Sequence, residues 1–130
     1  MKIASVLENQ DIEKRIAITP EIAKKYISLG FEVSLFENYG AHLGILDKEY
    51  MELGVSILKD EKEIIRSADI IVQLGLFDDN KSSLLKENQT FVGVLNPYDN
   101  KDKIDNLVKN NINIFSLELL PRITRAQSMD

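Results

Sequence analysis

Short apolar runs alternate with amphipathic segments along this chain of 130 residues. The apolar runs are rich in β-branched residues and are bounded by polar or turn-forming residues, a pattern that predicts buried strands. The expected strands are residues 2–7, 31–36, 55–58, 70–74, 90–95 and 112–117.

Between these runs, apolar residues recur at helical spacing. The first such segment carries clear end signals. Thr19 can cap a helix, Pro20 suits its first turn, and Gly30 can end it in a left-handed conformation. The expected helices are residues 20–29, 47–53, 60–67, 79–87 and 101–110.

Strands that alternate with helices of about ten residues predict βαβ units. We therefore expect one α/β domain over residues 1–130: an open, mostly parallel sheet with helices on both faces, of the flavodoxin or Rossmann type. The first strand is followed by Glu8-Asn9-Gln10 and not by G-x-G-x-x-G, and no P-loop sequence occurs. Any main dinucleotide-binding domain is thus expected outside these residues.

Composition removes several other classes of function. The chain is 44% hydrophobic and 28% charged, which is typical of a globular protein. Its net charge of -5 argues against a nucleic-acid partner. There is no cysteine and only one histidine, His42, so we expect no metal site. No apolar run is long enough to span a membrane, and the first residues do not resemble a signal peptide.

Ligands of open α/β sheets bind beyond the carboxyl ends of the strands. This rule directs attention to residues 8–15, 73–77, 96–98 and 118–130.

Three residues in these loops are possible edges of a site, and each has a structural alternative. Arg15 could hold a carboxylate or phosphate, or it could pair with Glu13 or Asp11 at the surface. Gln73 follows an apolar strand and is either a site residue or an amide satisfied by a neighbouring loop. Asn96 precedes Pro97, where a turn role is the default.

The last ten residues, 121–130, concentrate directional polar groups. Arg122, Arg125, Gln127 and Asp130 could converge on a flat ligand that bears an amide, if this segment is an ordered loop. The alternative is a solvated terminus.

This decapeptide, Pro121-Arg-Ile-Thr-Arg-Ala-Gln-Ser-Met-Asp130, closely resembles a loop of the proton-translocating NAD(P) transhydrogenases, in the NAD(H)-binding component of their alpha subunit. Arg15-Ile-Ala-Ile-Thr-Pro20 resembles the R-V-A-x-T-P signature that transhydrogenases share with alanine dehydrogenases. Matching elements at Gly30–Val33, Ala68–Ile71 and Asn96-Pro97 extend the resemblance over the whole chain.

The resemblance implies roles for individual residues. In the family, an Arg-Gln-Asp loop reaches the nicotinamide of NAD(H) and helps to position it for hydride transfer. Arg122, Gln127 and Asp130 occupy those three positions and are the implied catalytic residues. Because the cofactors carry the reaction, the protein mainly has to orient them. The implied cofactor-binding residues are Arg122, Thr124, Arg125, Gln127, Ser128 and Asp130.

Alanine dehydrogenases provide the contrast. They hold pyruvate with an Arg in the first signature, a Lys after the fourth strand and a His after the fifth. This chain keeps the Arg as Arg15, but it has Gln73 and Asn96 at the other two positions. Many transhydrogenases keep a Lys where Gln73 stands, so the role of this position is open. Amino-acid dehydrogenation and a non-catalytic α/β assembly module remain the alternatives.

The family also implies the wider context. NAD(H) would be shared with a Rossmann domain beyond residue 130, and NADP(H) would lie on a beta subunit that docks over the cleft. The other implied partners are the rest of the alpha subunit, membrane segments and a second copy in a homodimer. The expected location is cytoplasmic, peripheral on the inner side of the membrane.

Overall fold

The computed structural model describes residues 1–11, 13–94 and 99–116. A single six-stranded sheet runs through this portion of the chain, with the strand order β3-β2-β1-β4-β5-β6 and parallel pairing throughout. The strands are β1 (Lys2–Ser5), β2 (Glu32–Phe36), β3 (Ser56–Leu58), β4 (Ile70–Val72), β5 (Thr90–Gly93) and β6 (Asn113–Ser116). The open parallel sheet expected from the alternating pattern is therefore confirmed.

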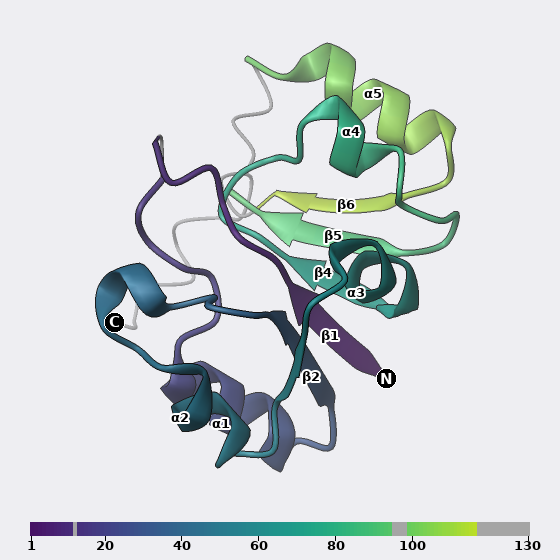
Figure 1. The fold of residues 1–130 in the computed structure, drawn as a ribbon. Coiled ribbons are helices and arrows are strands. Elements are labelled where there is room, and N and C mark those ends of the chain that lie inside the picture. Colours follow the sequence, from purple (N-terminus) through teal and green to yellow (C-terminus); the bar gives the residue numbers. More distant parts are fainter. Residues whose placement is uncertain (12, 95–98, 117–130) are drawn as a thin grey trace, which may run out of the picture.

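Helices cover both faces of this sheet (Figure 1). Helices α1 and α2 pack over β2 and β3 on one face, whereas α3 and α5 pack against β1 and β6 on the other. The helices are α1 (Pro20–Ser28), the 3-10 helix η1 (Ala41–Leu43), α2 (Asp47–Met51), α3 (Glu61–Ser67), α4 (Asp79–Ser82) and α5 (Lys101–Lys109). The expected three-layer architecture is confirmed.

Alternation along the strands divides the core into two clusters. Ile3 belongs to the cluster on the α1 side, while its neighbour Ala4 belongs to the cluster under α3 and α5. The same alternation separates Ile70 and Val72 from Ile71. Successive side chains of a strand point to opposite faces, so continuous apolar runs are what a doubly covered sheet requires.

The start of α1 follows the sequence signals. Thr19 has extended backbone angles, and its hydroxyl accepts a hydrogen bond from the backbone N–H of Ile22 at 3.3 Å. Pro20 occupies the first helical turn, where its missing N–H costs nothing. Gly30, just beyond the helix, has a φ of 98°, in the left-handed region that favours glycine.

One expected helix is much shorter than predicted. The pattern predicts a helix over the whole segment 79–87, but α4 ends at Ser82. The hydroxyl of Ser83 donates to the backbone carbonyl of Asn80 at 2.7 Å, a local bond of the kind that competes with continued helix. Leu84 and Leu85 instead pack against the core cluster on this face.

The strands are also shorter than the apolar runs that predicted them. β1 stops at Ser5 although its run continues to Leu7, and β4 stops at Val72. Beyond Ser5, the backbone groups of Val6 are bonded to the side chain of Gln73 and not to a neighbouring strand. A side-chain amide thus takes over where the backbone ladder ends.

On the α1 side, the portion of the sheet formed by β5 and β6 is open among the described residues. Val92 and Phe115 are register partners on this side, opposite to Phe91 and Ile114. Phe115 remains 59% exposed. The sheet is thus fully covered on the α3 and α5 side and half covered on the other.

Gln89 fixes the end of α3 to the start of β5. This side chain is 4% exposed. Its Nε2 donates to the backbone carbonyls of Ile65 and Ala68, each at 2.7 Å, and its Oε1 accepts from the N–H of Lys86 at 2.6 Å. One amide therefore satisfies three backbone groups at the point where the chain enters β5.

We expect Gln89→Leu to lower the free energy of unfolding by about 3 kcal/mol, because it leaves buried backbone groups without partners. Chemical denaturation followed by circular dichroism measures this loss. Gln10→Leu is the matched control. Its amide bonds His42 at the surface, so a change within about 0.5 kcal/mol is expected. Equal effects of the two substitutions would contradict the role given to Gln89.

Candidate functional site

The strand order reverses between β1 and β4, and this topological switch point carries a crevice. The crevice has a volume of about 490 Å³. It is lined by residues 7–9 after β1, by residues among 73–78 after β4, and by Lys81 and Lys103. Two of the four loops selected from the sequence therefore meet here.

Gln73 forms the floor of this site and is 2% exposed. Its Oε1 accepts from the hydroxyl of Ser5 and from the N–H of Val6, both at 2.8 Å. Its Nε2 donates to the carbonyl of Val6 at 3.1 Å and to Oε2 of Glu8 at 2.9 Å. The amide uses both lone pairs and both hydrogens, so it has nothing left to offer a ligand.

A second buried side chain, Tyr39, continues this hydrogen-bonded network. Its hydroxyl lies 2.9 Å from Oγ of Ser5 and accepts from the N–H groups of Ala17 and Ile18, both at 3.1 Å. Since the Ser5 hydroxyl donates to Gln73, the Tyr39 hydroxyl must donate to Ser5. Burial raises the pKa of Tyr39, which keeps this phenol protonated as a donor.

Glu8 is the charged end of the network. Its Oε2 accepts from the Gln73 amide and from the N–H of Leu74 at 2.7 Å, and its Oε1 accepts from the N–H of Gly75 at 3.1 Å. Burial raises the pKa of this carboxyl above its usual 4.5, although the two backbone N–H groups act in the opposite direction. The carboxylate is therefore held by three donors in a place that disfavours its charge.

Lys81 brings α4 to the same place. Its Nζ donates to the carbonyl of Leu7 at 3.1 Å and lies 3.4 Å from Oε2 of Glu61. The ammonium also lies 5.8 Å from the centre of the Phe77 ring, within the range of a cation–π contact. Its charge lowers the pKa of Glu8, so this lysine partly offsets the burial of the carboxylate.

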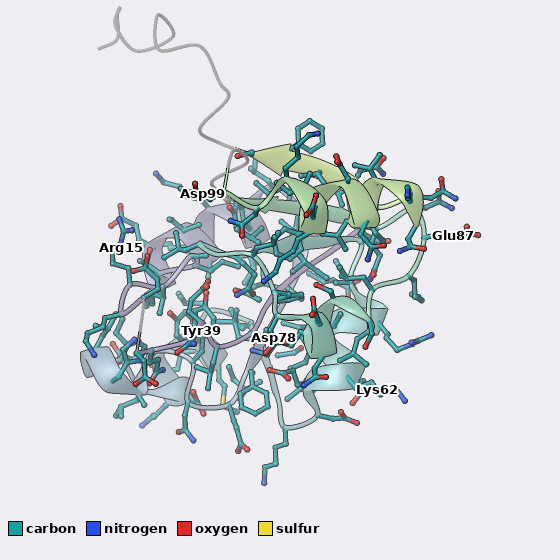
Figure 2. All side chains as sticks on the ribbon, turned by 90° about the horizontal axis from the view of Figure 1, so that it is seen from above. Arg15, Tyr39, Lys62, Asp78, Glu87 and Asp99 are labelled. Carbon is teal, nitrogen blue, oxygen red and sulfur yellow. The ribbon has the colours of Figure 1, made fainter. Side chains whose placement is uncertain are left out.

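Arg15 points away from the molecule, as Figure 2 shows, and its side chain is 78% exposed. Its Nε and one terminal nitrogen donate to the two carboxylate oxygens of Glu13, at 3.0 and 2.9 Å. The guanidinium holds the pKa of Glu13 at about 2. This pairing corresponds to the structural alternative considered for Arg15, and no described contact joins the guanidinium to Gln73.

His42 ties η1 to the loop before α1. Its Nε2 lies 2.7 Å from the carbonyl of Lys14, so this nitrogen carries the hydrogen, and Nδ1 accepts from the Gln10 amide at 3.1 Å. Both ring nitrogens thus have protein partners. Within the described ranges, no group of three or more His, Cys, Asp or Glu side chains is placed to hold a metal ion.

The other candidate residues lie outside the described residues. They are Asn96 and the terminal set Arg122, Thr124, Arg125, Gln127, Ser128 and Asp130. Their roles stay predictions. For the portion of the chain that is described, no helix is both long and apolar enough to cross a lipid bilayer.

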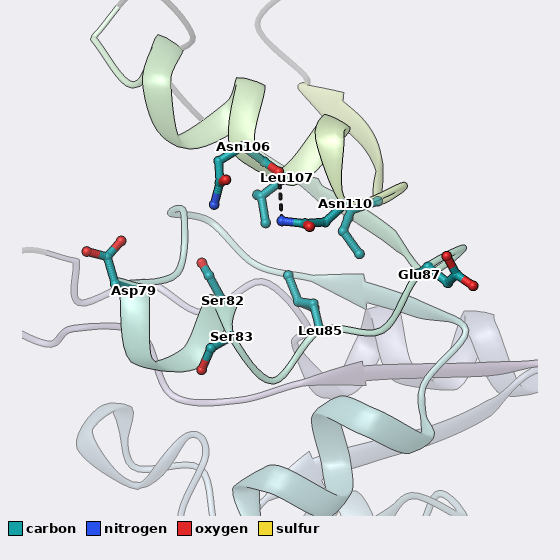
Figure 3. Close-up of a pocket in the computed structure, with 9 residues that line it drawn as sticks. Asp79, Ser82, Ser83, Leu85, Glu87, Asn106, Leu107 and Asn110 are labelled. Atoms are coloured by element: carbon teal, nitrogen blue, oxygen red, sulfur yellow. Dashed lines mark hydrogen bonds between the residues drawn. The ribbon is translucent and has the colours of Figure 1, made fainter.

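A larger pocket, of about 560 Å³, lies between α4 and α5 (Figure 3). Leu85 and Leu107 contribute apolar surface, while Asp79, Ser82 and Asn106 contribute polar groups. It extends to Ile112, just before the amino end of β6, which is the opposite edge of the sheet from the crevice. Position therefore favours the smaller crevice at the switch point as the candidate site.

The sequence drew attention to Gln73 but not to Ser5, Tyr39 or Glu8 as its partners. Glu8 gave a usable signal, because it is the first charged residue after the first strand and so lies at the carboxyl edge of the sheet. Tyr39 gave none, since it is 34 residues from Ser5 and only the fold brings them together. As assembled, the crevice offers a hydrogen-bonded carboxylate and two lysines at its wall, but no free cation on its floor among the described residues.

Comparison with known proteins places this geometry in a family. The family described as "Alanine dehydrogenase/PNT, N-terminal domain" matches residues 6–130. The first of the separate alpha-subunit chains of the NAD(P) transhydrogenase of Rickettsia prowazekii is 41% identical over the whole chain, and that of Rhodospirillum rubrum is 34% identical. The chain spans about a third of the length of these curated relatives, 35% of each.

Solved structures agree with this assignment. The transhydrogenase from Sinorhizobium meliloti matches the whole chain with a TM-score of 0.89 and 30% identity, over 39% of that protein's length. An L-alanine dehydrogenase matches 89% of the chain with a TM-score of 0.82, over 32% of its own length; at 17% identity it shows the fold alone. The chain belongs to the alanine dehydrogenase/PNT N-terminal domain family, and its resemblance to the NAD(P) transhydrogenase alpha subunit is confirmed.

Proposed function

We propose that this chain is the N-terminal domain of a larger NAD(P) transhydrogenase alpha subunit and takes part in hydride transfer between NADH and NADP, coupled to proton translocation. The main support is the similarity to transhydrogenase alpha subunits along the whole chain, at 41% and 34% identity. The chain alone lacks the glycine-rich turn of a dinucleotide site, so we expect it to be inactive by itself.

The state of Gln73 favours hydride exchange between cofactors over amino-acid oxidation. A keto acid carries a carboxylate, which a site usually holds with a cation. At the switch point the buried side chain is a neutral amide whose hydrogen-bonding groups are all occupied by Ser5, Val6 and Glu8. The position that would hold the substrate cation in an alanine dehydrogenase is therefore closed.

In this proposal, Arg122, Gln127 and Asp130 orient the nicotinamide of NAD(H), and Thr124, Arg125 and Ser128 add further polar contacts. Guanidinium and amide side chains can make paired hydrogen bonds to a carboxamide, which fixes the plane of the ring. Orientation of this kind is the protein's main contribution to hydride chemistry. No residue of the chain has to act as an acid, base or nucleophile.

NAD(H) would lie in a cleft between this domain and a Rossmann domain beyond residue 130. NADP(H), on the beta subunit, would meet the nicotinamide across that cleft. We further propose that the complete component is a homodimer, with this domain cytoplasmic and peripheral to the membrane segments of the enzyme.

In the full-length protein, we expect Arg122→Ala and Gln127→Asn to slow hydride transfer by about tenfold or more, which corresponds to at least about 1.4 kcal/mol in the barrier. NADH affinity should fall much less, because these side chains position the ring and most of the cofactor binds elsewhere. Stopped-flow absorbance gives the transfer rate, and calorimetry gives the affinity. Arg66→Ala, which removes an exposed arginine of α3, is the control. Unchanged transfer rates in both loop variants would overturn the assignment.

The shared family motivates a test of amino-acid dehydrogenation. We expect no NADH oxidation by the full-length protein when only pyruvate and ammonia are supplied, because Gln73 leaves no cation for the substrate carboxylate. Absorbance at the NADH band measures this activity directly. Turnover that depends on both compounds would instead support an alanine-type dehydrogenase using Arg15.

Calorimetric titration with NADH separates the proposal from a non-catalytic assembly module. We expect tight binding to a chain extended through the Rossmann domain and little binding to residues 1–130, because the cofactor site is shared. Binding by neither protein would remove the transhydrogenase proposal and favour the assembly module.

A further inference from the structure

Both oxygens of the Glu8 carboxyl accept hydrogen bonds, and every donor is an N–H group. Oε2 accepts two, from Gln73 Nε2 at 2.9 Å and from Leu74 at 2.7 Å, and Oε1 accepts one, from Gly75 at 3.1 Å. These bonds join the segment after β1 to the turn after β4. They also fix the backbone of residues that line the crevice.

Only an ionised carboxylate fits this arrangement fully. A protonated carboxyl turns one oxygen into a donor, and a glutamine at this position would turn one oxygen into an NH₂ group. Either change places a donor against a donor. Oε1 has the single, longer bond, so it is the oxygen that can take a proton at the smaller loss.

The same geometry makes proton uptake accessible. Glu8 lies where burial disfavours its charge, and its direct hydrogen-bond donors are neutral amides. The charged groups around it come from several elements. Glu13, in the loop before α1, raises the pKa of Glu8, and Lys81 on α4 lowers it. Lys81 is itself shared with Glu61 of α3. Asp78 and Lys103 line the same crevice, and Tyr39 is the phenol at the other end of the network.

We propose that Glu8 is a proton-dependent positioning residue of the switch-point crevice, which holds the Leu74–Gly75 backbone only while it is ionised and releases Gly75 when Oε1 takes up a proton. The crevice then has two shapes, which differ in the position of the turn after β4. This inference concerns the described residues of the chain and does not depend on the proposed hydride transfer.

The direction of the effect on stability follows from linkage. The pKa of Glu8 is raised in the folded state, so the fold binds this proton more tightly than the unfolded chain does. The stabilisation from Glu8 is therefore complete below the unfolded pKa and is lost as the pH rises through the folded pKa. At neutral pH, the ionised group holds the turn at a cost in free energy.

The test is an NMR pH titration of the ¹⁵N-labelled 130-residue chain from about pH 4 to pH 8. We expect the Gly75 amide proton to move with a midpoint above that of an ordinary glutamate, and the Leu74 amide proton to move less. Hydrogen exchange at Gly75, corrected for intrinsic pH dependence, should be faster on the acid side of this midpoint. In Glu8→Gln, Gly75 should resemble the protonated form at every pH.

Two variants move the midpoint without touching Glu8 and remain informative if Glu8→Gln fails to fold. Lys81→Met removes a positive charge and should raise the midpoint, whereas Glu13→Gln removes a negative charge and should lower it, each by roughly a few tenths of a pH unit. Glu52→Gln, an exposed carboxyl on the distant helix end of α2, is the control and should leave it unchanged.

A Gly75 amide that shows no transition would overturn the proposal, as would a midpoint that ignores both charge variants. A transition in Leu74 alone would place the proton on Oε2 and contradict the release of Gly75. Because no nucleotide is present in these measurements, they fail or succeed independently of the tests of hydride transfer.

Discussion

The side-chain amide of Gln73 is the interaction on which the centre of this structure depends. The two middle strands, β1 and β4, pair through only a few backbone positions. Beyond them, the amide bonds both the N–H and the carbonyl of Val6, and so replaces the backbone partner that a longer strand would supply. Its other bonds reach Ser5 and Glu8 and align the two loops that form the crevice. Burial makes these bonds strong, and it makes any unpaired member costly.

A fully paired amide also explains why this crevice combines a family-wide location with a particular chemistry. The switch point is where α/β sheets usually receive ligands. Here its floor is occupied by the protein's own hydrogen bonds, while its wall holds a carboxylate under opposing influences. Neutral donors and Lys81 favour the charged form of Glu8, and burial disfavours it. The balance of these effects distinguishes this site from one that holds an anionic substrate with a buried cation.

Much of the fold could be predicted from the pattern of apolar residues, because a doubly covered parallel sheet needs continuous apolar strands and helices with one apolar face. Local signals such as Thr19 and Gly30 placed the ends of α1 well. The pattern was less informative where side chains compete with the backbone. Ser83 shortens α4, and Gln73 shortens β1, through contacts that periodicity does not register. For the site, the rule on strand ends selected the correct loops. It could not reveal that Gln73, Ser5 and Tyr39 form one network, since these partners are joined only by the fold.

The position of β1 in the sheet has a consequence for how the chain folds. This strand is made before the other five, yet it lies in the interior of the sheet, with β2 on one side and β4 on the other. Its second edge can be paired only after residues 70–72 are available, and the Gln73 amide completes its end one residue later. Until then, a nascent chain carries an apolar strand with one open edge, which is a template for association with other chains. Closure of the sheet at β1 therefore depends on contacts that are distant in sequence, and these are slow to form.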